Sequence, residues 1–387
     1  MATRRTRRAA ASPTPAPWPR WRASGSKKIS SLAGLASALL LATAPQTIAF
    51  DLRNVPDWRD IARQGYAAAI LSARARDTGA ADSLRARGVL VGYHLQPWLP
   101  AWDGAPETTF VLDRTLYRLA SASDGWLRDT KGLIPLVHEP GITGLPYAFS
   151  NTPFAQRFGR ALGDFDPRAS FWYFDYGDMK YGVGWVTSLR AMDPKVWPPY
   201  AAGYRIMASQ VRAKRVCFYG KGDDFLCPEC DVYPFESVGN EPRDLYRYDR
   251  TLAMCRAAER AGKRGLIFCQ RADSAAHRRC LASIALLTGA WFNWRDFAVP
   301  EGFDRNLADP EHFDLDLGAP RDTMREIAPA VWRREFRRGF VIANVGSAPY
   351  RLSGAYTIDS SDGLVIQTRD RSGRAMRWRD DISIKAK

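Results

Sequence analysis

Residues 150–178, SNTPFAQRFGRALGDFDPRASFWYFDYGD, contain the helix–strand unit that decides the fold. Asn151 followed by Pro153 is typical of a helix start, because an Asn side chain caps the first backbone N–H groups and proline fits the first turn. The amphipathic segment from Thr152 to Gly163 is therefore expected to be a helix. The apolar run Phe171–Asp175 is expected to be a strand, since short runs of this kind are typical of strands buried on both faces.

The same alternation recurs along the chain. The runs expected to be strands are Tyr66–Leu71, Val89–Leu95, Gly132–Val137, Phe171–Asp175, Val216–Tyr219, Val232–Phe235, Gly265–Cys269 and Ala290–Trp294. Strands that alternate with helices indicate a parallel α/β fold, and eight of them within about 230 residues predict a (β/α)8 TIM barrel. An open doubly wound sheet is the alternative, but the Gly-rich phosphate turn that it normally carries after its first strand is absent.

The composition changes after the last of these runs. We assign residues 50–300 to the barrel and residues 301–330, which are rich in Asp, Pro and Gly, to a long loop. Residues 331–387 are expected to form a small C-terminal β appendage with a basic tail. Its strands are expected at Phe340–Asn344, Tyr350–Leu352, Tyr356–Ile358 and Leu364–Thr368.

Residues 1–49 have the pattern of a secretory signal. Lys27 and Lys28 precede the uncharged stretch Ile29–Ala44, and small residues follow up to Ala49. Basic, apolar and small-residue regions in this order are typical of a cleaved leader. We therefore expect cleavage after Ala49 and a periplasmic or secreted protein. A membrane becomes a partner only if the segment stays uncleaved as an anchor.

The net charge of +15 at first suggests a nucleic-acid partner, but its distribution argues against one. Residues 1–49 carry eight basic and no acidic side chains. The remaining 338 residues therefore hold 48 basic and 41 acidic side chains, a net charge of +7. A mildly basic globular body lacks the clustered basic footprint of a nucleic-acid-binding protein, so no nucleic-acid partner is expected.

Six cysteines lie within 64 residues: Cys217, Cys227, Cys230, Cys255, Cys269 and Cys280. An even number in an exported protein favours disulfides, whose pairing the spacing does not determine. The Cys227–Cys230 pair could instead be half of a zinc site or a redox pair. A second pair of zinc ligands is absent, and the motif lies in an expected loop and not between a strand and a helix.

The chemistry of a βα barrel is carried by residues at the carboxyl ends of its strands. Asp175 ends the fourth apolar run, and Glu236 follows the sixth. Two carboxylates placed in this way suit glycoside cleavage, which needs one protonated acid and one ionised group. Each has a structural alternative, because an Asp is often a turn former and a Glu is often a solvated loop residue.

Other polar and aromatic residues near the strand ends are candidates for substrate binding, since aromatic rings stack on sugar faces. These are Tyr93, His94, Trp98, Tyr176, Asp178, Tyr233 and Asn293. For Tyr93 and His94 the alternative is a core group, and for Asp178 it is an orienting or a surface residue. Most aromatic side chains in a barrel belong to its core.

Several other chemistries lack their motifs. No HExxH is present and the four histidines are scattered, so we expect no metal site and no cofactor. No GxSxG and no GxxxxGK[ST] occur, which argues against a serine hydrolase of the α/β-hydrolase type and against nucleotide hydrolysis.

The order of motifs along the chain resembles a known family. In sequence they are GYHLQPW, GWLRDTKG, SNTPFAQRFGRAL, FWYFDYGD, VYPFES, GAWFNW, FDLDLGAPRD and VWRREFRRGFVIANVG. Over roughly residues 85–355 the chain resembles the hypothetical TIM-barrel glycoside hydrolases, the family numbered fifteen in that provisional series. It is more distantly similar to the endo-α-1,4-polygalactosaminidases. The ending R-E-F-x-x-G-x-V-x-x-N, here Arg334–Asn344, is the most telling motif.

The resemblance implies a glycoside hydrolase in which Asp175 matches the strand-four acid and Glu236 the strand-six acid. The chain departs from the pattern at Ala169–Trp172, where members often show Asp-Gly, and in its CPEC loop.

We therefore predict an exported glycoside hydrolase that acts on a polysaccharide. Asp175 would be the nucleophile or base and Glu236 the proton donor, and the two roles are exchangeable because sequence does not give the carboxylate separation. One alternative is a non-catalytic carbohydrate-binding barrel. Another is an accessory protein of an export or exopolysaccharide system, whose cysteines and β appendage would act in assembly. No particular protein partner is predicted.

Overall fold

The computed structural model describes residues 47–51, 56–95, 114–129, 132–133, 136–139, 142–144, 147–174, 197–219, 229–237, 248–269, 275–296, 305–306, 317–353 and 356–368.

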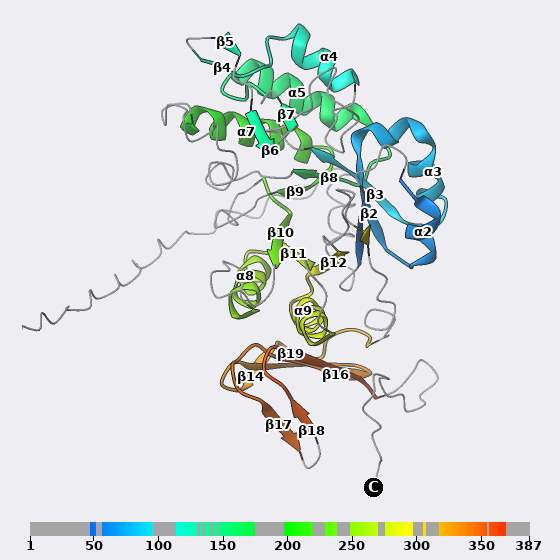
Figure 1. The fold of residues 1–387 in the computed structure, drawn as a ribbon, viewed down its shortest axis with the longest axis vertical. Coiled ribbons are helices and arrows are strands. Elements are labelled where there is room, and N and C mark those ends of the chain that lie inside the picture. Colours follow the sequence, from blue (N-terminus) through cyan, green and yellow to red (C-terminus); the bar gives the residue numbers. More distant parts are fainter. Residues whose placement is uncertain are drawn as a thin grey trace, which may run out of the picture.

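Eight parallel strands form a barrel, and Figure 1 labels most of them. In order around it they are β1 (Ile48–Asp51), β2 (Ala68–Ser72), β3 (Leu90–Leu95), β8 (Phe171–Phe174), β9 (Val216–Tyr219), β10 (Val232–Ser237), β11 (Arg264–Cys269) and β12 (Trp291–Asp296). A parallel bridge between Thr47 and Phe292 joins β12 back to β1. The short strand β13 (Arg305–Asn306) pairs antiparallel with the end of β12. The predicted (β/α)8 barrel is confirmed.

A buried side chain supports the closure between the first and last strands. The Asn293 Nδ2 group on β12 donates a hydrogen bond to the Ile48 carbonyl on β1 at 2.5 Å. Both residues are fully buried. The side chain thus links the two strands at which the sheet closes.

Helices alternate with the strands. They are α2 (Trp58–Arg63), the 3-10 helix η1 (Ala73–Thr78), α3 (Ala80–Arg85), α4 (Arg114–Ala122), α5 (Thr152–Phe165), α7 (Trp197–Arg212), α8 (Tyr248–Arg260) and α9 (Ala275–Thr288). The expected start of α5 is confirmed, because Asn151 Oδ1 accepts a hydrogen bond from the Phe154 N–H at 3.2 Å and Pro153 lies in the first turn.

The period-two alternation of the strands divides the core into two. One set of strand residues fills the barrel interior: Ile48, Phe50, Ala68, Ile70, Phe171, Tyr173, Val216, Phe218, Val232, Leu266, Phe268 and Trp291. The alternate residues pack outward against the helices. Gly92 on β3 belongs to the interior face, and a Cβ there would lie 2.1 Å from the Phe171 ring. Only glycine leaves room for this ring inside the barrel.

Strand β1 spans the boundary predicted between the leader and the barrel. Ile48 and Ala49 are fully buried in this strand, so the barrel includes at least two residues before Phe50. The sequence pattern hides the strand because its residues continue the apolar and small-residue stretch of the leader. The leader and its cleavage remain predictions.

The run Gly132–Val137, which was predicted to be a barrel strand, is not one. Its described residues belong to two antiparallel pairs between α4 and α5, formed by β4 (Arg128–Asp129) with β5 (Gly132–Leu133) and by β6 (Leu136–Glu139) with β7 (Ile142–Gly144). Pro135 interrupts the run, and proline lacks the N–H that a central strand must donate. The eighth barrel strand is β1 instead.

The predicted C-terminal β appendage is present, but it begins before residue 331. Its first strand, Arg325–Ala328, lies within residues 301–330, which were predicted to be a long loop, and this largely exposed strand lacks the apolar run that marks a buried one. Strands β14 (Arg325–Ala328), β15 (Val331–Phe336), β16 (Gly339–Asn344) and β19 (Asp362–Gln367) form an antiparallel sheet, and β17 (Tyr350–Ser353) pairs with β18 (Tyr356–Ile358). Figure 1 shows α9 between the barrel and this sheet.

One ion pair and one hydrogen bond fix the appendage to α9. Arg279 of α9 forms a bidentate ion pair with Asp362 of β19, at 2.9 and 2.7 Å. Arg334 of β15 donates from Nη1 to the Leu287 carbonyl of α9 at 2.5 Å. The appendage is therefore anchored to the barrel through one of its own helices.

The predicted disulfides are absent among the cysteines whose side chains are described. Cys217, Cys230, Cys255 and Cys280 are buried thiols. They lie on β9, just before β10, on α8 and on α9, respectively. Three of them contact backbone carbonyls: Cys217 that of Ala208, Cys230 that of Val232, and Cys280 that of Asn344. Cys227 and the Cys269 side chain lie outside the described residues.

Within the described ranges, no helix is both long enough and apolar enough to cross a membrane.

The closure of the barrel can be tested at Asn293. We expect Asn293→Asp to lower the free energy of unfolding by about 2 kcal/mol or more, because a carboxylate oxygen replaces the N–H donor that faces the Ile48 carbonyl. Asn151→Asp is the matched control. Its side chain acts as a hydrogen-bond acceptor at the start of α5, where Asp caps as well as Asn, so the change should be within about 0.5 kcal/mol. Urea unfolding of both variants measures the difference, and equal stabilities would contradict this role for Asn293.

Candidate functional site

An aromatic layer fills the barrel interior near the carboxyl ends of the strands. It consists of Phe50, His94, Tyr173 and Phe268, each the last but one residue of its strand. The Phe50 ring centroid lies 5.6 Å from that of His94 and 5.7 Å from those of Tyr173 and Phe268. His94 stacks on Tyr173 at 5.6 Å with an interplanar angle of 21°. This aromatic layer forms the base of the barrel end at which βα-barrel enzymes carry their active sites.

Polar residues lie in register with the aromatic layer. Ser72, the last residue of β2, pairs with His94, and it is only 5% exposed. On the other side of the barrel, Phe268 pairs with Glu236 of β10 and with Asn293 of β12. Residues in register on neighbouring parallel strands share a face of the sheet. The backbone thus puts positions 72, 94, 236 and 293 on the interior face of the barrel.

The structure locates only part of the predicted site. The side chains of His94 and Asn293 are described and lie on the interior face. Glu236 is described by its backbone alone, within β10. Asp175 directly follows β8 in the sequence and lies outside the described residues, as do Trp98, Tyr176 and Asp178.

Tyr93 and Tyr233 lie on the opposite face from the barrel interior. Tyr93 is adjacent to His94 in sequence, so the alternation of β3 sends the two side chains to opposite sides. Both tyrosines are fully buried in the core between strands and helices, where Tyr233 packs against Phe235. Tyr93 and Tyr233 therefore do not lie beside His94 and Asn293. Both are core residues, which was the alternative stated for Tyr93.

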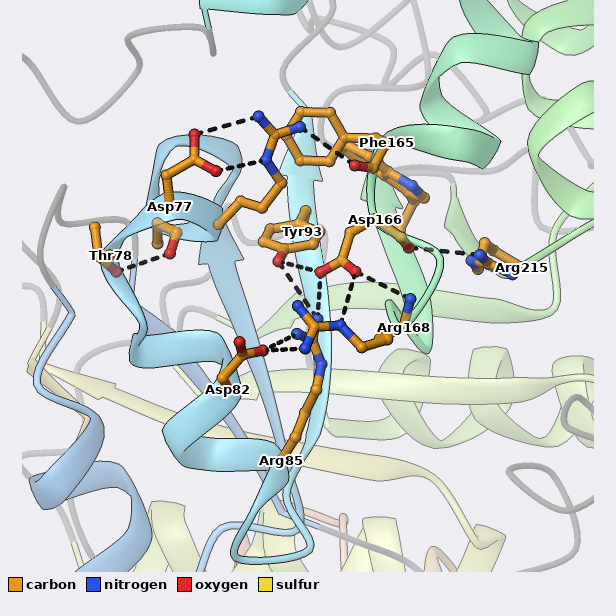
Figure 2. A network of polar contacts seen from close by, with 12 residues as sticks. Asp77, Thr78, Asp82, Arg85, Tyr93, Phe165, Asp166, Arg168 and Arg215 are labelled. Carbon is orange, nitrogen blue, oxygen red and sulfur yellow. Dashed lines mark hydrogen bonds and ion pairs between the residues drawn. The ribbon is translucent and has the colours of Figure 1, made fainter.

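The Tyr93 hydroxyl belongs to a polar network outside the barrel (Figure 2). It donates to Asp166 Oδ2 at 2.7 Å, and Arg85 Nη2 contacts the same oxygen at 2.6 Å. The Arg168 backbone N–H donates to Asp166 Oδ1 at 3.0 Å. Asp82 pairs with both Arg85 and Arg168 at 2.9 Å. Asp166 caps the end of α5, so the network ties α3 and β3 to the turn that leads into β8.

Electrostatics explains how Asp166 stays ionised although its side chain is only 3% exposed. Burial alone would raise the pKa of Asp166, but the hydrogen bonds from Tyr93, Arg168 and Arg85 outweigh it and lower the pKa below its ordinary value. Burial, together with the bond to Asp166, raises the pKa of Tyr93 well above its ordinary value. A paired, fully bonded carboxylate of this kind supports the fold and offers no reactive group.

Sequence reasoning missed the interior residues that accompany His94. Ser72, Phe50 and Phe268 were not selected as site residues, although each lies close to the end of its strand. Side chains alternate between the two faces of a strand. Once one interior residue is known on each strand, counting in steps of two along the strand identifies these three.

No group of three or more His, Cys, Asp or Glu side chains in the described part of the chain could hold a metal ion.

The network in Figure 2 yields a stability prediction. Asp166→Asn should lower the free energy of unfolding by about 1.5–3 kcal/mol, because it removes the charge that Arg85 and Tyr93 contact. Since the folded-state pKa of Asp166 is lowered, its stabilisation is present above the unfolded pKa, near 4, and is lost as pH falls through the folded value. The deficit of the variant should therefore shrink in acid.

The control is Asp164→Asn, two residues away on α5. Asp164 is exposed and pairs with Lys214, which is also exposed, so its loss should change stability by less than about 0.5 kcal/mol. Urea unfolding at pH 7 and pH 3 measures both variants. A pH-independent deficit for Asp166→Asn would argue against the ionised network.

No family model and no curated protein matches the chain. Among solved structures, it is similar to the glycoside hydrolase domain of PelA from Pseudomonas aeruginosa, with 13% identity and a TM-score of 0.46 over 68% of this chain and 99% of that one. An alpha-amylase from Lactobacillus plantarum matches with 10% identity and a TM-score of 0.48, covering 83% of this chain and 98% of that one. The alpha-N-acetylgalactosaminidase NagBb from Bifidobacterium bifidum matches with 11% identity and a TM-score of 0.47, covering 86% of this chain and 59% of that one.

Proposed function

We propose that the chain is a glycoside hydrolase that cleaves O-glycosidic bonds in a polysaccharide, with Asp175 and Glu236 as its two reacting carboxylic groups. The observation that carries the proposal is the register of the closed barrel. Glu236 lies in the row of Phe268 and Asn293, on the interior face at the carboxyl end of β10. Asp175 follows β8 two residues after Tyr173, whose ring is part of the aromatic layer.

Strand spacing supports the pairing of these two acids. β9 alone separates β8 from β10, and neighbouring strands lie about 4.8 Å apart, so the two backbones are about 10 Å apart. Glycosidases need carboxyl groups about 5–5.5 Å apart for a retaining mechanism or about 6.5–9.5 Å apart for an inverting one. Two acidic side chains that point into the barrel from backbones about 10 Å apart would bring their carboxyl groups within this range of separations.

The chemistry requires a division of roles, because a glycosidase needs one protonated carboxylic acid beside one ionised carboxylate. We assign Glu236, which lies at the end of β10, as the acid that protonates the leaving oxygen. Asp175 would remain ionised and either attack the anomeric carbon or activate a water.

The family and the compartment are part of the proposal. The motif order and the Arg334–Asn344 ending support membership of the hypothetical TIM-barrel glycoside hydrolases. The basic, apolar and small-residue pattern of residues 1–49 supports export to the periplasm or the medium. A polysaccharide outside the cytoplasm is a substrate that an exported hydrolase would meet.

The proposal is tested with a panel of polysaccharides and the full-length chain produced in an exporting host. We expect new reducing ends from at least one glycan, and a loss of turnover of about 100-fold or more in Asp175→Asn and in Glu236→Gln. Both variants should still bind the glycan, because an amide keeps the shape of the carboxyl group.

Glu259→Gln is the matched control for Glu236→Gln. Glu259 lies on α8 and is the partner of Arg334 at 3.7 Å, outside the barrel interior, so its variant should keep full turnover. If wild type and both interior variants bind the glycan alike and none cleaves it, the chain is a carbohydrate-binding barrel and the hydrolase proposal fails.

A further inference from the structure

The interior face of the barrel changes from apolar to polar near the carboxyl ends of its strands. On β2 the interior residues Ala68 and Ile70 precede Ser72, and on β3 Gly92 precedes His94. A polar group costs free energy when it is buried, unless hydrogen bonds compensate for the water that it loses. Each polar side chain at this level therefore needs a reason to be there.

Structural hydrogen bonds give such a reason for two of these side chains. Asn293 donates to the Ile48 carbonyl and supports the closure of the barrel. The Ser72 Oγ atom accepts a hydrogen bond from the backbone N–H of Arg74 at 3.3 Å, at the start of η1. Both groups thus support the fold at the ends of their strands.

The surroundings of His94 are aromatic. Its ring stacks on Tyr173 and meets Phe50 edge to face, with both ring centroids 5.6 Å away. A phenylalanine ring would make the same two packing contacts. What an imidazole adds at this position is its two nitrogen atoms, which donate and accept hydrogen bonds.

His94 is also the residue that solvent reaches most among the described interior side chains at this end. It is 8% exposed, compared with 5% for Ser72 and 4% for Phe50. Tyr173 and Phe268 are 1% and 0% exposed. The exposed fraction thus falls from β1, β2 and β3 toward β8 and β11, so a ligand that enters this end from solvent would meet His94 before the other rings of the aromatic layer.

The same position borders the two proposed acids. His94 pairs in register with Tyr173 of β8, and Asp175 follows Tyr173 by two residues. Glu236 lies on the interior face at the end of β10, which β9 alone separates from β8. A sugar unit held between the two acids would therefore lie over the aromatic layer, of which His94 is the most exposed ring.

We infer that His94 hydrogen-bonds a hydroxyl group of the sugar unit at the cleavage point and so selects glycans in which that hydroxyl is free. The inference rests on the proposed function for the cleavage point, but the hydroxyl contact can be tested without turnover. A neutral imidazole and a hydroxyl group each have a donor and an acceptor. A site that bonds a substrate hydroxyl discriminates against the analogue without it, because the polar group of the protein is then left unpaired.

The first measurement follows the histidine ring resonances of the full-length protein by NMR. D-Glucose, D-galactose, D-mannose and D-xylose are the probes, and we expect at least one to shift the resonances of His94. Those of His277 are the internal control and should stay in place, because this residue is also buried but lies on α9, bonded to Tyr248. For the sugar that shifts His94, one of its monodeoxy analogues should bind about 10-fold more weakly.

The second measurement uses variants that change the nitrogens or the neighbouring residue. His94→Phe keeps the ring packing, so it should bind the sugar about 10-fold more weakly than wild type and no better than the deoxy analogue. His94→Gln retains a donor and an acceptor and should restore part of the preference. Tyr93→Phe is the matched control: it removes a hydroxyl group from the adjacent residue on the opposite face and should keep the wild-type preference.

Three results would overturn the inference. They are the absence of any sugar that shifts the His94 resonances, equal binding of the sugar and all its deoxy analogues by wild type, and an unchanged preference in His94→Phe. If His94→Phe does not fold by circular dichroism, the wild-type resonances and the deoxy analogues decide the question.

The outcomes separate this inference from the hydrolase proposal. Sugar binding that depends on His94, without cleavage of any glycan, supports the hydroxyl contact and refutes the hydrolase. Cleavage of a glycan with the same kcat and KM in wild type and His94→Phe supports the hydrolase and refutes the contact.

Discussion

The contact between β12 and β1 closes the barrel, and the arrangement of the strand ends follows from it. The Thr47–Phe292 bridge and the hydrogen bond from Asn293 to the Ile48 carbonyl join the two edges of the sheet. A closed parallel barrel has no free edges, and all its strands end on one side. Residues far apart in the sequence, such as Ser72 and Glu236, therefore reach the same end of the molecule.

Closure also gives adjacent residues of one strand different roles. On β3, His94 lies in the aromatic layer inside the barrel, whereas Tyr93 lies outside and bonds to Asp166. The outer network holds α3, β3 and the start of β8 together, while the inner face is left for the polar positions at the strand ends. Stability and chemistry are thus separated by the two faces of the same strands.

The sequence predicted most of the barrel but not its first strand. Seven of the apolar runs coincide with barrel strands, because a strand buried on both faces has a distinctive composition. The strand Ile48–Asp51 was missed because its residues continue the apolar leader, and Pro135 marks the one run that is not a barrel strand. Pairing across the barrel is a long-range property, so neither the bridge to Phe292 nor the role of Asn293 could be derived from local pattern.

The site was predicted less completely than the fold. Position near a strand end selected His94, Glu236 and Asn293, which lie on the interior face, but the same criterion also selected Tyr93 and Tyr233, which face the helices. Composition does not distinguish the two faces of a strand that is buried on both. Ser72 was missed because a lone serine carries no motif, and its relation to His94 follows only from register.

A crystal structure of the protein would give the distance between the Asp175 and Glu236 carboxyl groups, on which a two-carboxylate mechanism depends. We expect about 5–10 Å, with both groups on the interior side of the barrel end, and the value within that range would distinguish a retaining from an inverting mechanism. A separation above about 12 Å, or either carboxyl group directed toward the helices, would contradict a two-carboxylate site.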